Sequence, residues 1–167
     1  MTKLQNLQST PKIQILETLE GIWGVGPVLA GKLYSNGIRS IEQLREQSMQ
    51  MLTANQRVGL KYYEDFLEKM PRAEATKIFE TVQAAAKKLF GENVIVNICG
   101  SYRRGRPTCG DVDILITRSD NRQVRGMLER LVVELEDQGF LKERLSLSAS
   151  SVDKAKEMYM GVCKVRD

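Results

Sequence analysis

The chain has 167 residues, of which 42% are hydrophobic and 28% charged, and its 25 Lys and Arg side chains outnumber its 21 Asp and Glu. This length allows one sizeable domain or two small ones, and so small a positive excess identifies no anionic partner by itself. The absence of histidine excludes histidine general bases, Ser-His-Asp triads and histidine metal ligands. The sequence shows neither an apolar run of about 18 residues nor an apolar leader, so no membrane span is expected, and three cysteines without a CxxC pair fit a reducing compartment.

The first half of the chain is predicted to consist of helices joined by short turns. Apolar residues at helical spacing predict a first helix over residues 12–19. A second helix follows the glycine-rich stretch GIWGVGP, with Pro27 in its first turn and Gly37 at its C-terminal end. The two helices would therefore be joined by a glycine-punctuated turn.

N-capping residues mark the next two helices. Ser40 precedes a short third helix, and Thr53 precedes a fourth helix that is predicted to run as far as Pro71. The alanine-rich segment 73–90 predicts a long fifth helix. Residues 12–90 are therefore predicted to form an all-helical subdomain.

The second half of the chain changes to alternating strands and helices. The β-branched run VIVNIC predicts a strand over 94–99, and DVDILIT predicts another over 111–117. An amphipathic helix is expected over 122–138, and the polar loop SLSASSVDK separates it from a third strand over 157–165. The fold class is therefore predicted to be α+β, with the helical subdomain followed by a mixed sheet and flanking helices at 91–167.

The segment GSYRRGRPTCGDVD, residues 100–113, places arginines and carboxylates between two predicted strands. Because side chains at positions i and i+2 of a strand point to the same face, we expect Asp111 and Asp113 to lie side by side. Hard oxygen ligands suit Mg²⁺ or Mn²⁺, and paired carboxylates hold the two ions of phosphoryl-transfer enzymes. The spacing therefore predicts a site for divalent cations.

The residues before the aspartates suit a phosphate group. Gly100 and Ser101 follow a predicted strand and begin a helical turn, an arrangement that presents backbone N–H groups and a hydroxyl to an anion. Positive charge that can neutralise a triphosphate comes from Arg103, Arg104 and Arg106. The alternative interpretation is a surface hairpin in which these arginines pair with the aspartates.

The segment GSYRRGRPTCGDVDILIT resembles the catalytic signature of the family X DNA polymerases, which belong to the nucleotidyltransferase superfamily. The wider superfamily shares GS followed by DxD on a strand, whereas YRRG and CGD are typical of family X. The resemblance implies nucleotide addition by two metal ions, with Asp111 and Asp113 as the catalytic pair and as two of three metal carboxylates. It also implies that the incoming nucleotide is held by Arg72, Gly100, Ser101, Arg104 and Gly110.

The stretch GIWGVGPVLAGKLYSNG has the form of a hairpin between two helices, whose glycine backbone can approach a DNA phosphate without reading a base. A helix–helix corner with a capping glycine is the alternative interpretation. By the same family resemblance, the hairpin binds the DNA backbone through Gly24, Val25 and Gly26. The resemblance further implies that the backbone carbonyls of Glu20, Ile22 and Val25 bind a monovalent cation, Na⁺ or K⁺.

The resemblance extends from about Ile13 to Val165 and implies a nuclear DNA-directed DNA polymerase of gap-filling or end-joining repair. Its substrates would be gapped or broken DNA and deoxynucleoside triphosphates. The family's third metal carboxylate follows the YMGVC segment at a distance that this sequence does not reach. We therefore expect the 167 residues to bind DNA and Mg²⁺–nucleotide but to be inactive or nearly so alone. A non-catalytic DNA-binding module and a nucleotidyltransferase for another acceptor are the alternatives.

Overall fold

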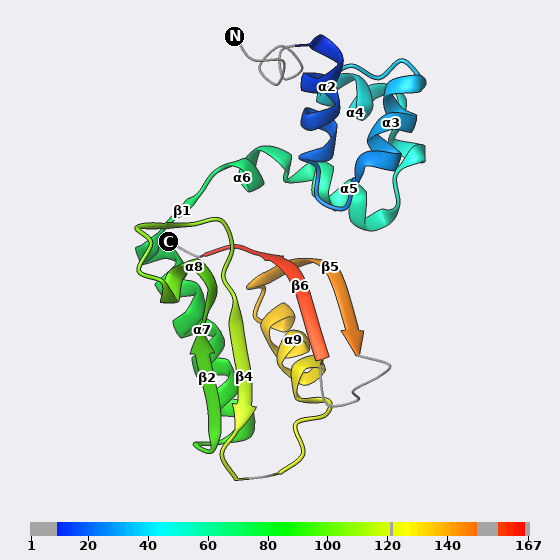
Figure 1. The fold of residues 1–167 in the computed structure, drawn as a ribbon. Coiled ribbons are helices and arrows are strands. Elements are labelled where there is room, and N and C mark those ends of the chain that lie inside the picture. The colour runs from blue at the N-terminus through cyan, green and yellow to red at the C-terminus, as the bar shows by residue number, and fades with distance from the viewer. Residues whose placement is uncertain (1–9, 121, 150–156, 166–167) are drawn as a thin grey trace. The chain divides into compact units, whose positions relative to one another are not determined.

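The computed structural model describes residues 10–120, 122–149 and 157–165, and it divides into two compact units, one ending at Leu67 and the other beginning at Glu68 (Figure 1). The first unit consists of helices, and the second combines helices with two-stranded sheets. The α+β class predicted from the sequence is therefore confirmed. Among the described residues, no helix combines the length and the apolar composition that crossing a bilayer requires.

Short helices build the first unit around one apolar core. Leu19, Leu33 and Leu44 come from three different helices and are completely buried, so each amphipathic helix contributes one face to the same cluster. In chain order the helices are α2 (Pro11–Glu20), α3 (Pro27–Ser35), α4 (Ile41–Gln47), the 3₁₀ helix η1 (Met49–Met51), α5 (Ala54–Lys61) and α6 (Tyr63–Leu67).

Capping residues delimit these helices where the sequence predicted them. At the C-terminal end of α3, Gly37 adopts a φ of 90°, and the Ile38 N–H donates to the Leu33 carbonyl at 3.1 Å, as in a Schellman motif. At the start of α4, the Ser40 hydroxyl accepts a hydrogen bond from the Gln43 N–H at 3.2 Å. Both interactions satisfy backbone groups that a helix end leaves unpaired.

The prediction of one continuous helix after Thr53 is wrong, because the structure divides it. Thr53 and Gln56 do form a capping box at the start of α5. However, Tyr62 leaves helical geometry with φ −105° and ψ 23°, so α5 ends at Lys61. Tyr63 then packs, partly buried, against the core of the first unit. Tertiary packing of this ring therefore overrides the helical pattern of the local sequence.

Helix α7 (Arg72–Phe90) packs with the sheets of the second unit. Ile78 and Val82 of α7 share a buried cluster with Val96 and Leu131. The other elements of this unit are β1 (Met70–Pro71), β2 (Val94–Ile98), α8 (Gly100–Arg103), β3 (Thr108–Cys109), β4 (Ile114–Arg118), α9 (Met127–Asp137), β5 (Leu141–Ala149) and β6 (Glu157–Cys163).

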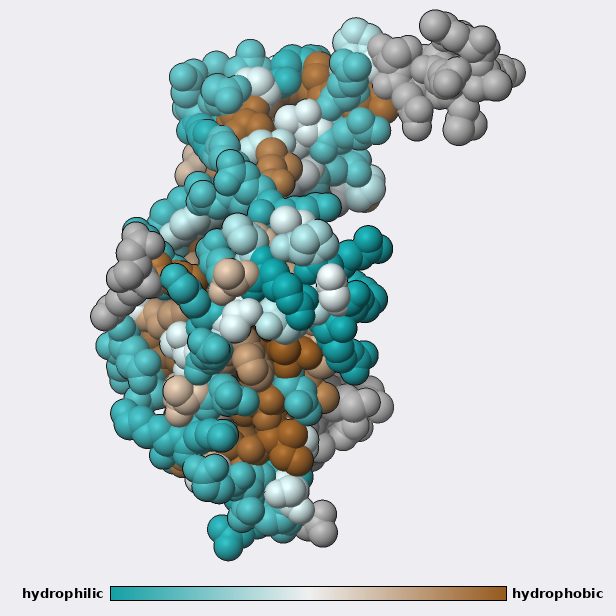
Figure 2. Space-filling view, turned by 90° about the vertical axis from the view of Figure 1, so that its left-hand side faces the viewer, coloured by the Kyte–Doolittle hydropathy of each residue, from teal (hydrophilic) through white to brown (hydrophobic). Residues whose placement is uncertain are grey.

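Three antiparallel strand pairs, β1–β3, β2–β4 and β5–β6, make up the sheets of the described residues. In β2, Val94 and Val96 are buried, whereas Ile95 between them and Leu115 of β4 are 38% and 57% exposed. This alternation follows the period of two of a strand that is covered on one face. Figure 2 shows patches of hydrophobic surface on the face of the second unit that is turned toward the viewer.

Two other predicted boundaries are wrong. The helix predicted over 122–138 begins only at Met127, because Gly126 before it adopts a left-handed φ of 76°, which a helix cannot continue. Residues 146–149 of the predicted polar loop belong to β5, because they pair with β6. Residues 150–154 of that loop lie outside the described residues.

An ion pair lies at the end of β4, and its arginine is also hydrogen-bonded to the end of α7. Arg118 donates to both carboxylate oxygens of Asp120, from Nε to Oδ1 at 2.8 Å and from Nη2 to Oδ2 at 2.5 Å. Its Nη1 also donates to the carbonyl of Phe90, the last residue of α7, at 3.3 Å. The bidentate hydrogen bond from the guanidinium holds the pKa of Asp120 well below its ordinary value.

We predict that Asp120→Asn makes the free energy of unfolding less dependent on pH in acid. Because the pKa of Asp120 is lowered in the folded chain, the ionised carboxylate contributes stability above its ordinary pKa of 3.8, and this contribution is lost as the pH falls toward the lowered value. Urea unfolding between about pH 6 and about pH 2 measures the effect. Glu80→Gln, at an exposed position within α7, is the control, and equal pH dependence in wild type and Asp120→Asn would contradict the prediction.

Candidate functional site

The chain reverses direction at Gly100, directly after strand β2. Gly100 has a φ of 55°, and a Cβ atom built on it would overlap Oδ2 of Asp113. At the same point the Cys99 N–H donates to the Asp113 carbonyl at 2.7 Å. Glycine is required here both for the left-handed turn and for the close approach of the carboxylate. The structure therefore brings together the GS turn and the second aspartate of DVD.

The strand that carries these carboxylates begins later than predicted. The sequence predicts a strand over 111–117, but β4 begins at Ile114, and Asp111 and Asp113 are exposed residues that precede it. The β2–β4 ladder ends at the pair Ile98 and Ile114, and after one further hydrogen bond, from the Cys99 N–H to the Asp113 carbonyl, the chain turns away at Gly100. The prediction that both aspartates lie within the strand is therefore wrong.

The hydroxyl of Ser101 is buried and has no hydrogen-bond partner within the part of the chain that the structure describes. An unpaired buried hydroxyl costs about 1–3 kcal/mol, and buried polar atoms are nearly always paired in folded proteins. The Ser101 carbonyl accepts a hydrogen bond from the Arg106 N–H at 3.2 Å, which folds the following loop back toward it. An acceptor oxygen supplied by a ligand would satisfy the hydroxyl.

Ser101 is also one of the residues that line a surface pocket of about 460 Å³. Its lining combines two cations, two hydroxyls and glycine backbone, a set that suits phosphate groups. The lining residues are Lys69, Ser101, Arg106, Pro107, Thr108 and Gly110.

The pocket includes part of the predicted nucleotide site and adds residues to it. Ser101 and Gly110 were predicted and line the pocket, whereas Arg104 is exposed and lies outside the lining. Sequence reasoning missed Lys69 and Thr108. Strands β1 and β3, which pair and place these two residues, are two residues long each and leave no periodic signal in the sequence.

Arg72 contacts the loop that follows α8. Its Nη1 donates to the Tyr102 carbonyl at 2.7 Å and to the Arg106 carbonyl at 3.3 Å, and its guanidinium carbon lies 3.7 Å from the centre of the Tyr102 ring. The Tyr102 hydroxyl is also hydrogen-bonded to Thr76 Oγ1 at 2.9 Å. The first turns of α7 therefore anchor the loop that contributes Arg106 to the pocket.

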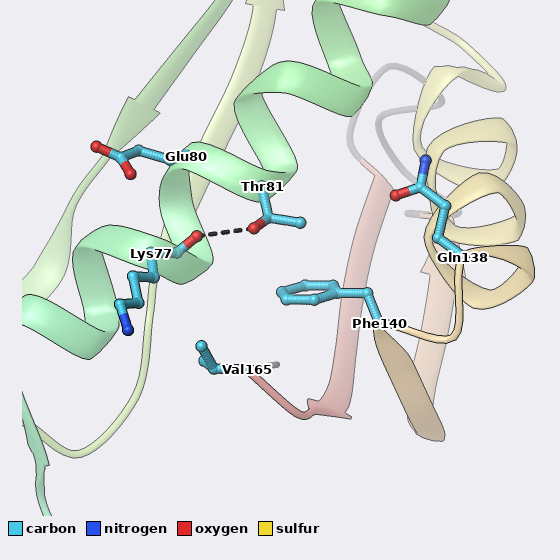
Figure 3. Close-up of a pocket in the computed structure, with 6 residues that line it drawn as sticks. All are labelled: Lys77, Glu80, Thr81, Gln138, Phe140 and Val165. Atoms are coloured by element: carbon cyan, nitrogen blue, oxygen red, sulfur yellow. Dashed lines mark hydrogen bonds between the residues drawn. The ribbon is translucent and has the colours of Figure 1, made fainter. Parts of the chain in front are cut away.

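A larger pocket of about 580 Å³ is formed by other residues, between α7 and the turn that connects α9 to β5 (Figure 3). Figure 3 shows the ring of Phe140 directed into this space, and the Thr81 hydroxyl donates to the Lys77 carbonyl at 2.9 Å. Its lining residues are Lys77, Glu80, Thr81, Gln138, Phe140 and Val165. One ammonium and one carboxylate give this lining no net charge, so the Ser101 pocket is the better candidate for a phosphate ligand.

The two carboxylates of Asp111 and Asp113 suit a metal ion whose other ligands come from a substrate and from water. In residues 10–120, 122–149 and 157–165, no group of three or more Cys, Asp or Glu side chains is arranged to hold a metal ion. Mg²⁺ is commonly bound by one or two carboxylates together with waters and substrate phosphates. Asp111 and Asp113, which closely follow the pocket residue Gly110 in the chain, would provide the two carboxylates of that second arrangement.

The predicted hairpin lies between α2 and α3, and its two glycines differ. Gly24 has a φ of 82°, and its carbonyl accepts a hydrogen bond from Nε2 of Gln56 at 2.7 Å. Gly26 has a φ of −98° and a ψ of 178°, which any residue can adopt, and no atom lies within 4 Å of a Cβ built on it. The backbone at Gly26 is therefore open, whereas Gly24 is held by the protein.

The carbonyls predicted to bind a monovalent cation line the same turn. The Val25 N–H donates to the Ile22 carbonyl at 2.9 Å, which leaves one lone pair of that oxygen available. The carbonyls of Glu20 and Val25 accept no hydrogen bond from any other described residue. Oxygen atoms with free lone pairs are the ligands that hard cations prefer.

Comparison with known proteins matches both units. Residues 69–167 match the family model described as DNA polymerase beta palm, and residues 17–67 match the fingers domain of DNA polymerase lambda. DNA polymerase lambda of Rattus norvegicus is 39% identical over 165 residues, which are 99% of this chain and 28% of that protein. DNA polymerase lambda of Arabidopsis thaliana is 35% identical over 167 residues, 98% of this chain and 31% of that protein. The chain thus spans about three-tenths of the length of these relatives.

A helical unit followed by a unit with a glycine-serine turn, paired aspartates and antiparallel strands defines the fingers and palm of a nucleotidyltransferase. The palm model matches more than half of the chain. The chain therefore belongs to the family X DNA polymerases, and the family predicted from the sequence is confirmed. A palm of this family works with divalent metal ions.

We predict that Gly100→Ala destabilises the second unit by roughly 1–3 kcal/mol, because the new methyl group must adopt a left-handed backbone and displace the Asp113 carboxylate. Urea unfolding measures the change. Gly110→Ala is the matched control, because it lies in the same loop and a Cβ there meets no atom within 4 Å. Equal stability of the two variants would contradict the packing described here.

Proposed function

We propose that this chain carries the nucleotide-binding and DNA-binding parts of a DNA-directed DNA polymerase, which adds deoxynucleotides to a primer 3′-hydroxyl by two-metal phosphoryl transfer. The observation that supports this most is the contact at Gly100, where the Asp113 carboxylate lies against the α-carbon of the GS turn. The unpaired hydroxyl of Ser101 is the next residue along the chain. A group for a metal and a group for a phosphate are therefore adjacent, as a metal-bound triphosphate requires.

Asp111 and Asp113 would hold the divalent ions, Mg²⁺ or Mn²⁺. Bound there, the ions supply charge neutralisation at the phosphates and activation of the primer hydroxyl. Asp113 is oriented before any ligand binds, because its carboxylate packs on Gly100 and its carbonyl accepts the Cys99 N–H. Preorganised groups of this kind need little rearrangement during the reaction.

The triphosphate would lie in the Ser101 pocket. The Ser101 hydroxyl donates to a phosphate oxygen, Gly100 and Gly110 let the backbone approach, and cations offset the negative charge. The cations proposed for this role are Lys69, Arg104 and Arg106. For Arg72 we propose an indirect role in nucleotide binding, because its Nη1 is already bonded to two carbonyls of the loop that forms the pocket.

The hairpin would bind the DNA backbone through Gly24, Val25 and Gly26, without base specificity. A Na⁺ or K⁺ ion on the carbonyls of Glu20, Ile22 and Val25 would add positive charge next to a DNA phosphate. The helical subdomain, proposed from the sequence at 12–90, would thus hold gapped or broken DNA, while the palm residues in 91–167 bind deoxynucleoside triphosphates.

Efficient transfer needs more carboxylates than the described residues bring together. The family that the sequence resembles uses three metal-binding carboxylates for two-metal catalysis. Among the described residues, Asp111 and Asp113 have no third acidic neighbour arranged to hold a metal ion. We therefore propose that the 167 residues bind both substrates but transfer nucleotides poorly by themselves. On the same resemblance we propose a role in gap-filling or end-joining repair in the nucleus.

We predict that the chain binds a deoxynucleoside triphosphate in a Mg²⁺-dependent manner and that Asp113→Asn weakens this binding at least about tenfold, because it removes a metal-binding charge. Isothermal titration calorimetry with and without Mg²⁺ measures both effects. Asp137→Asn, at an exposed position at the end of α9, is the control. Rapid nucleotide incorporation on gapped DNA by the wild-type chain would contradict the proposed lack of activity. DNA binding without any metal-dependent nucleotide binding would instead identify a non-catalytic module.

We predict that Gly26→Val weakens DNA binding several-fold without changing the thermal stability of the first unit. The backbone of Gly26 is of an ordinary extended type and a Cβ there meets no protein atom, so the side chain obstructs only an approaching phosphate. Fluorescence anisotropy with gapped DNA at fixed salt measures the affinity. Ala84→Val, at an exposed position in α7, is the control, and wild-type affinity in Gly26→Val would remove the hairpin from the DNA-binding surface.

A further inference from the structure

The side-chain amide of Gln56 is hydrogen-bonded at both ends. Its Oε1 accepts a hydrogen bond from the Thr53 N–H at 2.9 Å, which is half of the capping box of α5. Its Nε2 donates to the carbonyl of Gly24 in the hairpin at 2.7 Å. The second bond links residues that are 32 positions apart in the chain, and helix capping does not require it.

The bond from Gln56 completes the restraint of one peptide group. The carbonyl of Gly24 and the N–H of Val25 belong to the same planar peptide unit. The carbonyl is held by Gln56, and the N–H donates to the Ile22 carbonyl at 2.9 Å. Both edges of the 24–25 peptide are therefore fixed, and the direction in which the chain enters Gly26 is fixed with them.

Helix α5 itself is locked against the hairpin, so Gln56 has a rigid support. A Cβ built on Gly59 would lie 2.5 Å from the Trp23 carbonyl oxygen, which means that the two backbones are already in contact. Gly24 is confined less tightly, because a Cβ on it would lie 3.2 Å from Cγ of Gln56. The left-handed turn at Gly24 thus packs directly against the side chain that holds its carbonyl.

We infer that Gln56 is a positioning residue of the hairpin: it sets the 24–25 peptide so that the Gly26 backbone faces DNA and the Ile22 and Val25 carbonyls face a monovalent cation. The effect on DNA rests on the proposed function, whereas the effect on the peptide does not. A residue that only capped α5 would influence the stability of the helix and leave the hairpin unchanged.

Two variants separate positioning from capping. Gln56→Met keeps the length of the side chain and removes both of its hydrogen bonds. Thr53→Ala removes the other half of the capping box, in which the Gln56 N–H donates to Thr53 Oγ1 at 3.3 Å. It leaves both hydrogen bonds of the Gln56 side-chain amide in place. Both variants weaken the cap of α5, but only Gln56→Met releases Gly24.

The first measurement needs no DNA. Amide hydrogen exchange of Val25 reports the restraint of the 24–25 peptide, because its N–H is bonded to Ile22. We expect exchange of Val25 to become roughly three- to tenfold faster in Gln56→Met than in Thr53→Ala at equal global stability, as loss of one hydrogen bond implies. Equal exchange of Val25 in the two variants would overturn the inference, whatever the chain does to DNA.

The second measurement is DNA affinity by fluorescence anisotropy on gapped DNA, in KCl and in tetramethylammonium chloride of equal ionic strength. We expect Gln56→Met to bind roughly three- to tenfold more weakly in KCl and to lose the preference for K⁺ that wild type and Thr53→Ala show. Equal affinity and equal K⁺ preference in the two variants would overturn the role of Gln56 in DNA binding. If the wild-type chain binds no DNA while Val25 exchange responds as expected, the proposed function fails and the structural role of Gln56 stands.

Discussion

The contact between the Asp113 carboxylate and the α-carbon of Gly100 is the constraint on which the candidate active site depends. It joins the end of β2 to the start of β4 at the point where the Cys99 N–H pairs with the Asp113 carbonyl. Because the turn at Gly100 is left-handed and has no room for a side chain, the next residue, Ser101, is placed with its hydroxyl buried and unpaired. The proposed metal-binding group and the proposed phosphate-binding group thus owe their proximity to the backbone freedom of one glycine.

The loop that completes the pocket is held from outside. Strands β1 and β3 are too short to be stable as an isolated pair, and the loop between α8 and β3 has little core of its own. Arg72 stabilises this loop, because its guanidinium stacks on the Tyr102 ring and donates hydrogen bonds to the carbonyls of Tyr102 and Arg106. At the other end of α7, the Phe90 carbonyl accepts a hydrogen bond from Arg118 of β4. Helix α7 therefore contacts both the sheet and the pocket loop.

Local signals in the sequence predicted those parts of the fold that depend on local physics. The caps at Ser40 and Thr53 and the β-branched strand from Val94 are set by short-range preferences, and each was found. Lys69 was missed because its position is set by pairing with a segment distant in the chain. The second hydrogen bond of Gln56 was missed for a similar reason, since the capping-box pattern accounts for this residue without reference to the hairpin. Tertiary contacts rather than propensity decide such positions.

Each unit contains one glycine turn that is fixed in a similar way. In each, a glycine with positive φ is fixed by a side chain from a distant segment, Gln56 on Gly24 and Asp113 on Gly100. Next to it, the backbone of Gly26 is open in one unit, and the buried hydroxyl of Ser101 has no hydrogen-bond partner among the described residues in the other. Phosphate recognition that ignores the base gains nothing from base-edge contacts, so its affinity depends on donors that are ordered before the ligand arrives. Fixing these glycines during folding would lower the entropy lost when a phosphate binds, if both turns serve the proposed phosphate contacts.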